Sequence, residues 1–194
     1  MSRRSRTWLY GVFGIVILVT FLLRVTPRGT AGPPVLGQLQ GFSLVDQNGN
    51  PFSREDLLGH VWVVDFIFTT CAGPCPVMSG QFAELQERFS KLKDVRLLSI
   101  SVNPEFDTPS VLKDYGARYA ANHDRWIFLT GRLDDIHRLA ADGFHVGSVE
   151  EPIFHSTRFI LVDRNARIRG YYISTELDEM QKLWHDVRAL SVTT

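Results

Sequence analysis

The chain has 194 residues, with 21 Lys or Arg and 21 Asp or Glu, so its formal net charge is zero. This length provides one core-bearing domain rather than two large ones. A hydrophobic share of 44% excludes a wholly disordered chain, and the even charge balance argues against a nucleic-acid partner. With only two cysteines, the chain is neither a disulfide-stapled miniprotein nor a four-cysteine zinc module.

The N-terminus has the pattern of a membrane-targeting segment. Three arginines within residues 1–6 precede an uncharged apolar run, and residues 7–25 are predicted to form a single-pass transmembrane anchor. Because positive residues stay on the cytoplasmic side, residues 1–6 are expected in the cytoplasm and the later residues beyond the membrane. A cleaved signal peptide, with a small-residue site at 29–31, is the alternative. An uncleaved anchor is favoured, and either segment exports the domain.

The remainder of the chain divides by composition. Residues 26–37 are rich in proline and glycine and predict a linker between the membrane and the domain. Residues 38–191 contain no internal repeat and predict one domain, which residues 192–194 follow as a short tail.

Strand and helix signals alternate along this domain. A hairpin is predicted first, turning at Asn48-Gly49. Runs rich in β-branched and aromatic residues predict strands at 41–46, 61–68, 95–102, 126–129, 157–162 and 168–173. Helical spacing of apolar residues predicts helices at 79–91, 108–120, 132–141 and from Thr175 onward, with Thr108 and Thr175 as N-caps. The last two strands flank a turn at 163–166 and predict a second hairpin.

This alternation indicates the α/β class, with a central mixed β-sheet flanked by helices on both faces. Within that class we expect a thioredoxin-like fold, although the pattern alone does not select it over other α/β sandwiches.

The two cysteines occur where the buried strand at 61–68 gives way to a helix, in the run Cys71-Ala72-Gly73-Pro74-Cys75-Pro76. Sites in open α/β sheets lie at this kind of position, and a helix N-terminus favours thiolate over thiol. A structural disulfide over so short a loop stabilises a fold by only about 2 kcal/mol, against about 4 to 5 kcal/mol for a long loop. A functional pair, acting in redox exchange or metal binding, is therefore favoured.

A metal site needs a further ligand, and the chain has six histidines. Four are expected at the surface: His60, His123, His137 and His185. His145 is a weak candidate in a loop, and Met78 is expected in the core rather than on a metal. His155 immediately precedes a strand and so lies in a loop at a sheet end. Position alone favours a structural or solvated role for such a histidine, and the residues by themselves leave its role open.

Three segments resemble the Sco/SenC family of membrane-anchored, thioredoxin-like copper proteins. Residues 65–76 match the family's strand and CxxxCP motif, with the sequence DFIFTTCAGPCP. Residues 101–109 match its SVDPxxDTP motif, with the sequence SVNPEFDTP. Residues 155–163 match a stretch that begins with His-Ser, with the sequence HSTRFILVD. The motifs occur in the family's order across most of the predicted domain.

The resemblance implies a copper chaperone that delivers copper to the dinuclear copper centre of cytochrome c oxidase. It implies that Cys71, Cys75 and His155 bind copper as Cu(I) or Cu(II), and that the two cysteines form a redox pair able to close a disulfide bond. It also implies a bacterial inner-membrane location with the domain in the periplasm. The implied partners are the copper-bearing oxidase subunit and other periplasmic copper chaperones.

Two positions depart from the family's usual pattern. Asn103 replaces the aspartate of the SVDP motif, and Phe154 replaces an aspartate that commonly precedes the histidine. A carboxylate beside a ligating histidine can orient its ring, so the second change bears on copper affinity and valence. A membrane-anchored thiol–disulfide reductase that keeps the cysteines of an oxidase subunit reduced, and a redox or copper sensor, are the alternative functions.

Overall fold

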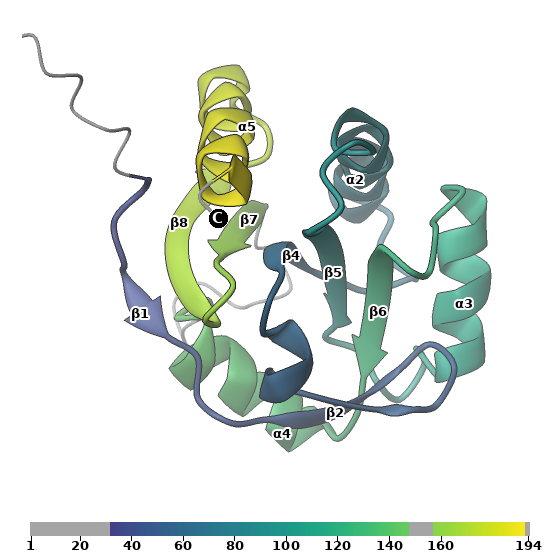
Figure 1. The fold of residues 1–194 in the computed structure, drawn as a ribbon. Coiled ribbons are helices and arrows are strands. Elements are labelled where there is room, and N and C mark those ends of the chain that lie inside the picture. The colour runs from purple at the N-terminus through teal and green to yellow at the C-terminus, as the bar shows by residue number, and fades with distance from the viewer. Residues whose placement is uncertain (1–31, 148–156, 193–194) are drawn as a thin grey trace, which may run out of the picture. The chain divides into compact units, whose positions relative to one another are not determined.

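A single mixed sheet organises residues 32–147 and 157–192, which are the residues that the computed structural model describes. They belong to the second of two units, Met1–Ala31 and Gly32–Thr194. Within these residues, eight strands follow one another across the sheet in the order β1-β8-β7-β4-β5-β6-β2-β3 (Figure 1). The strands are β1 (Gly37–Gln38), β2 (Ser43–Asp46), β3 (Pro51–Ser53), β4 (Val61–Ile67), β5 (Val95–Ser101), β6 (Trp126–Thr130), β7 (Arg158–Val162) and β8 (Arg167–Ile173).

The centre of the sheet is parallel and its margins are antiparallel. β4 and β6 both run parallel to β5, whereas β7 lies antiparallel to β4. All seven residues of β4 are buried, as expected for an inner strand covered on both faces. Side chains alternate along it, so Val63 and Ile67 enter the core on one face, whereas Val64 and Phe66 enter the core on the other.

Helices cover both faces of the sheet (Figure 1). The helical elements are η1 (Arg54–Leu57), α2 (Cys75–Arg88), α3 (Pro109–Arg118), α4 (Leu133–Arg138), η2 (Leu139–Gly143) and α5 (Leu177–Val192). Apolar residues of α2, α3 and α5 share one core cluster, and those of α4 and η2 belong to the other. The expected mixed sheet between two helical layers is therefore confirmed.

Both predicted hairpins form. The first turns at Asn48-Gly49, where Gly49 has φ +83°, a left-handed conformation that glycine adopts at little cost. A carboxylate oxygen of Asp46 accepts hydrogen bonds from the backbone N–H groups of Asn48 and Asn50, both at 2.8 Å. The second hairpin joins β7 to β8.

Helix boundaries differ from the sequence expectations in three places. α2 begins at Cys75, four residues before the predicted start, because prolines that interrupt the apolar pattern are tolerated in a first helical turn. The predicted helix at 132–141 is shorter and continues into the π-helical turn η2. The last helix begins at Leu177, so the prediction that Thr175 is its N-cap is wrong.

The N-terminal end of the described chain runs along β8. The backbone N–H of Leu36 donates to the carbonyl oxygen of Ile168 at 2.8 Å, and the guanidinium of Arg169 donates to the carbonyl oxygen of Pro33 at 2.7 Å. The predicted anchor, residues 7–25, lies outside the described residues. None of the helices in the described ranges combines the length and apolar character needed to cross a membrane.

Candidate functional site

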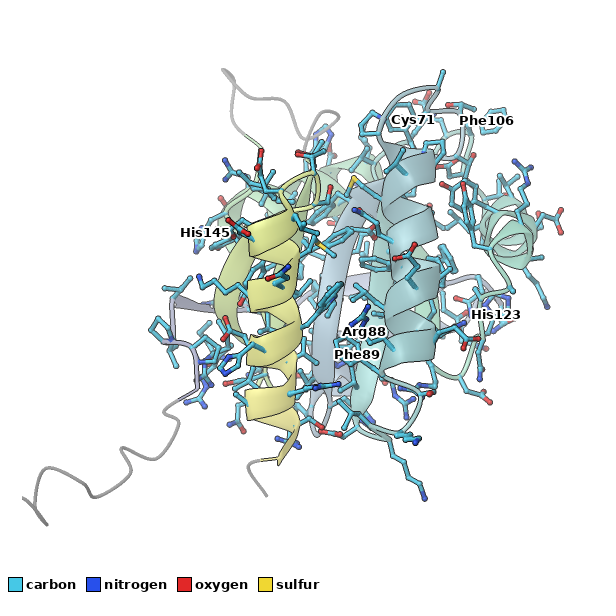
Figure 2. All side chains as sticks on the ribbon, turned by 90° about the horizontal axis from the view of Figure 1, so that it is seen from above. Cys71, Arg88, Phe89, Phe106, His123 and His145 are labelled. Atoms are coloured by element: carbon cyan, nitrogen blue, oxygen red, sulfur yellow. The ribbon has the colours of Figure 1, made fainter. Side chains whose placement is uncertain are left out.

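The two cysteines lie at the end of the sheet formed by the C-terminal ends of the central strands β4 and β5. β4 gives way to a loop of residues 68–74, and α2 begins at Cys75. The backbone N–H of Cys71 donates to the carbonyl oxygen of Phe68 at 3.1 Å, which turns the loop tightly before the helix. Pro74 occupies the N-cap position of α2, where its missing N–H removes no intrahelical bond. The loop therefore places Cys71 at one end of α2, as Figure 2 shows.

The two thiols differ in exposure. Cys71 is partly exposed, whereas Cys75 is 3% exposed and belongs to the core cluster that α2 forms with the sheet. No disulfide joins them, and the backbone N–H of Gly73 donates to the sulfur of Cys71 at 3.4 Å. An incoming metal or thiol therefore meets Cys71 first. Met78 is 1% exposed, which confirms its expected place in the core.

These environments separate the pKa values of the two thiols. Burial opposes ionisation of Cys71, but hydrogen bonds from the thiol and backbone of Cys75 and from Gly73 outweigh it, so the pKa of Cys71 is lowered. Burial and the hydrogen bond from its thiol to Cys71, with the negative charges of Cys71 and Asp65, raise the pKa of Cys75 to about 12. Cys71 is thus the thiol that ionises first. Cys75 keeps its proton until it binds a metal ion or attacks a disulfide.

A buried carboxyl faces the same core as Cys75. Asp65 is 0% exposed and lies on the side of β4 that packs against α2. Among the described residues, neither of its carboxylate oxygens has a hydrogen-bond partner. Burial away from water raises the pKa of Asp65 to about 7, although the nearby hydroxyl of Ser99 on β5 and the backbone of Asp65 itself partly oppose this shift. The sequence motifs indicate no role for this residue, although a lone aspartate within a continuous apolar strand is a recognisable signal.

The described histidines lie apart from the cysteines or on the surface. His137 and His185 are exposed on helices, as expected. His60 and His123 are half-buried rather than at the surface, because their rings pack edge-on against Trp62 and Phe128, respectively. His123 and His145 are both well separated from Cys71 in Figure 2.

His155 and Phe154 lie outside the described residues, so the predicted third ligand remains a prediction. Within residues 32–147 and 157–192, no group of three or more His, Cys, Asp or Glu side chains could hold a metal ion. The described part of the chain therefore contributes the two cysteines of the predicted ligand set. Asn103, the other departure from the family pattern, lies in the loop that follows β5.

A mixed sheet with two thiols at the start of the helix that follows an inner strand defines a thioredoxin-like dithiol protein. The sequence model of the SCO1/SenC family matches residues 36–191. The SCO1 protein homolog of Bacillus subtilis (strain 168) is 33% identical over 164 residues, spanning 81% of this chain and 85% of that protein. The chain belongs to the SCO1/SenC family.

Solved structures are similar over most of the chain. One is BsSco, described as a Sco-family cytochrome c oxidase assembly protein with a disulfide switch; it gives a TM-score of 0.72 at 31% identity and covers 84% of this chain and 99% of its own. Yeast Sco1 with copper bound gives a TM-score of 0.59 at 27% identity and covers 79% and 94%, respectively. The expected thioredoxin-like fold and the family resemblance are both confirmed.

Proposed function

We propose that this protein binds one copper ion through Cys71, Cys75 and His155 and delivers it to the dinuclear copper centre of cytochrome c oxidase. The observation that carries the proposal is the reduced pair of cysteines at a sheet edge, one partly exposed with a lowered pKa and one buried. Membership of a family that includes copper-bound yeast Sco1 supports copper as the metal.

The chemistry of the donor set fits copper. Two thiolates and an imidazole form a soft set with few ligands, which suits Cu(I), and cysteine–histidine sites also hold Cu(II). A structural zinc site would require a fourth protein ligand. Because thiolate and not thiol binds metal, the lowered pKa of Cys71 favours capture, whereas binding by Cys75 requires the release of its proton.

The position of β7 supports His155 as the third ligand. β7 runs antiparallel to β4, so its first residues lie at the edge where β4 ends and the cysteine loop begins. His155 precedes Thr157 by two residues, and two residues of chain span at most about 7 Å. The described chain therefore enters β7 at the same end of the sheet as the cysteine loop, which supports His155 as the third ligand.

A thiol–disulfide reductase is the second candidate, because the two cysteines have the properties of an attacking and a resolving thiol. The ionised Cys71 would attack a disulfide of the partner and release one partner thiolate, forming a mixed disulfide. Cys75 would then lose its proton and attack the sulfur of Cys71, which releases the second partner thiolate and leaves a Cys71–Cys75 disulfide. A redox or copper sensor uses the same chemistry with a signalling partner.

The proposed location is the bacterial inner membrane, with residues 7–25 as a single-pass anchor and the domain in the periplasm. The arginines within residues 1–6 support this orientation. A cleaved signal peptide would export the same domain. In either case the copper-bearing oxidase subunit is the proposed recipient, and other periplasmic copper chaperones are proposed donors.

Copper transfer separates the two functions. Full-length protein in detergent, loaded anaerobically with one Cu(I), is mixed with the metal-free copper-bearing oxidase subunit, whose cysteines have first been reduced. We expect copper to leave this protein and appear on the recipient, as measured by metal analysis after separation. If the reduced recipient takes up no copper from this protein, but metal-free protein reduces the disulfide of a separate, oxidised sample of the recipient, the chaperone proposal is wrong and the reductase is correct.

A further inference from the structure

The loop that precedes Cys71 is attached to a buried carboxylate from a distant part of the chain. The backbone N–H of Thr69 donates to one oxygen of Asp107 at 3.0 Å, and the hydroxyl of Thr69 donates to the other at 2.5 Å. Thr69 lies two residues before Cys71, within the turn closed by the hydrogen bond from Cys71 to Phe68. Asp107 thus holds the loop at the base of its turn.

Asp107 is itself held by rigid elements on both sides. The hydroxyl of Ser101, the last residue of β5, donates to Asp107 at 2.6 Å. The backbone N–H of Asp107 donates to the carbonyl oxygen of Asn103 at 2.9 Å. The next residue, Thr108, is the N-cap of α3, and its hydroxyl accepts a hydrogen bond from Val111. The carboxylate is therefore fixed to the sheet and to α3, and its hydrogen bonds to Thr69 hold the loop against both elements.

The burial pattern shows that this contact is built into the loop after β5. Asp107 is 0% exposed, whereas Phe106 beside it is 54% exposed. This reverses the usual preference, because burial stabilises an aromatic side chain and costs free energy for a carboxylate. The carboxylate points inward because it accepts three hydrogen bonds there, from the Thr69 N–H, the Thr69 hydroxyl and the Ser101 hydroxyl. These bonds offset the free-energy cost of its burial. Figure 2 draws Phe106 and Cys71 at the same end of the molecule.

We propose that Asp107 is a positioning residue that holds the Thr69–Cys71 turn in the conformation in which Cys71 and Cys75 act as a pair. The inference gives a role to the residues 101–109 motif, which the proposed ligand set leaves unused. It rests on the proposed function only in that both assign the site to these cysteines. Without Asp107, the turn would sample conformations in which the two sulfurs no longer converge.

The test compares Asp107→Ala with Asp163→Ala in the full-length, metal-free protein in detergent. Asp163 is a matched control because it is 3% exposed and its carboxylate accepts bonds from Arg167 and Arg169. It follows the end of β7 that pairs with the start of β4, so it lies at the sheet edge opposite the cysteines. Three quantities are measured: the melting temperature, the equilibrium constant for closing the Cys71–Cys75 disulfide against glutathione, and the hydrogen-exchange rate of the Thr69 amide.

We expect Asp107→Ala to lower the equilibrium constant for disulfide closure at least fivefold, because the two sulfurs converge less often, and to speed exchange of the Thr69 amide at least tenfold. Asp163→Ala should lower the melting temperature but change both site quantities less than twofold. Asp107→Asn should remain within twofold of the wild type, since its amide oxygen can accept from the Thr69 N–H and from Ser101, and its NH₂ can donate to the Thr69 hydroxyl. Wild-type site quantities in Asp107→Ala, or changes of equal size in Asp163→Ala, would overturn the inference.

Thr69→Val keeps the test decisive if Asp107→Ala does not fold. This change removes the hydroxyl bond to Asp107 and leaves the backbone bond in place. A shift of both site quantities in the direction expected for Asp107→Ala supports positioning, and wild-type values contradict it. Copper titration of the same proteins is separate: if the wild type binds no copper while these shifts occur, the proposed function fails and the positioning role stands.

Discussion

Replacing His155 by alanine is expected to weaken Cu(I) binding more than 100-fold, because loss of an outer hydrogen-bond partner alone costs about 10–100-fold and this change removes a ligand. Cys71→Ser and Cys75→Ser should each weaken binding at least as much, since a hydroxyl is a poor ligand for a soft metal ion. The measurement is an anaerobic competition titration of reduced full-length protein against a Cu(I) chelator of known affinity.

His145→Ala is the matched control for this comparison. His145 is an exposed loop histidine in the same part of the sequence, and it lies well away from Cys71 in Figure 2. Its replacement should leave the affinity within twofold of the wild type. Unchanged affinity in His155→Ala would remove His155 from the site, and a large loss in His145→Ala would show that the wrong histidine was assigned.

The buried carboxyl of Asp65 is expected to make stability depend on pH. Its pKa is raised from 3.8 to about 7 in the folded protein, so between these values the folded chain holds a proton that the unfolded chain has lost. The free energy of unfolding therefore falls as pH rises from about 4 to about 7, relative to Asp65→Asn, by about 4 kcal/mol for a shift of about three units. Urea unfolding of both proteins at pH 4, 5, 6 and 7 measures this difference.

Asp163 provides a control of opposite sign. Burial opposes ionisation of this carboxyl, but hydrogen bonds from Arg169, Asn165 and Arg167 outweigh it and lower the pKa of Asp163. Its contribution is present above pH 4 and is lost as pH falls through the folded pKa. The difference between wild type and Asp163→Asn should therefore grow, not shrink, as pH rises from the acid range. A flat difference for Asp65→Asn across pH 4–7 would show that Asp65 ionises normally.

The strands and their class could be predicted because their signals are local. The run at 61–68 consists of apolar residues that both faces of a sheet bury, and Asn48-Gly49 is a turn signal in its own right. The spacing of apolar residues predicts α2 only from Ser79, because Pro76 does not extend that spacing, although proline is tolerated in the first turn where it lies. Thr175 resembled an N-cap, but the helix begins only at Leu177.

The site was predictable in its chemistry but not in its contacts. A pair of cysteines between a buried strand and a helix is a local pattern, and the structure places both free thiols at that position. The bond between Thr69 and Asp107 joins residues 38 positions apart, so no periodicity or spacing reveals it. The pKa difference between Cys71 and Cys75 likewise arises from burial, which depends on how α2 packs on the sheet.

X-ray absorption at the copper edge tests the proposed ligand set most directly. Reduced full-length protein carrying one Cu(I) should give a spectrum with two sulfur ligands and one imidazole, and the imidazole signal should disappear in His155→Ala. A spectrum with sulfur ligands alone, or an imidazole signal that survives this substitution, would contradict the assignment of copper to Cys71, Cys75 and His155.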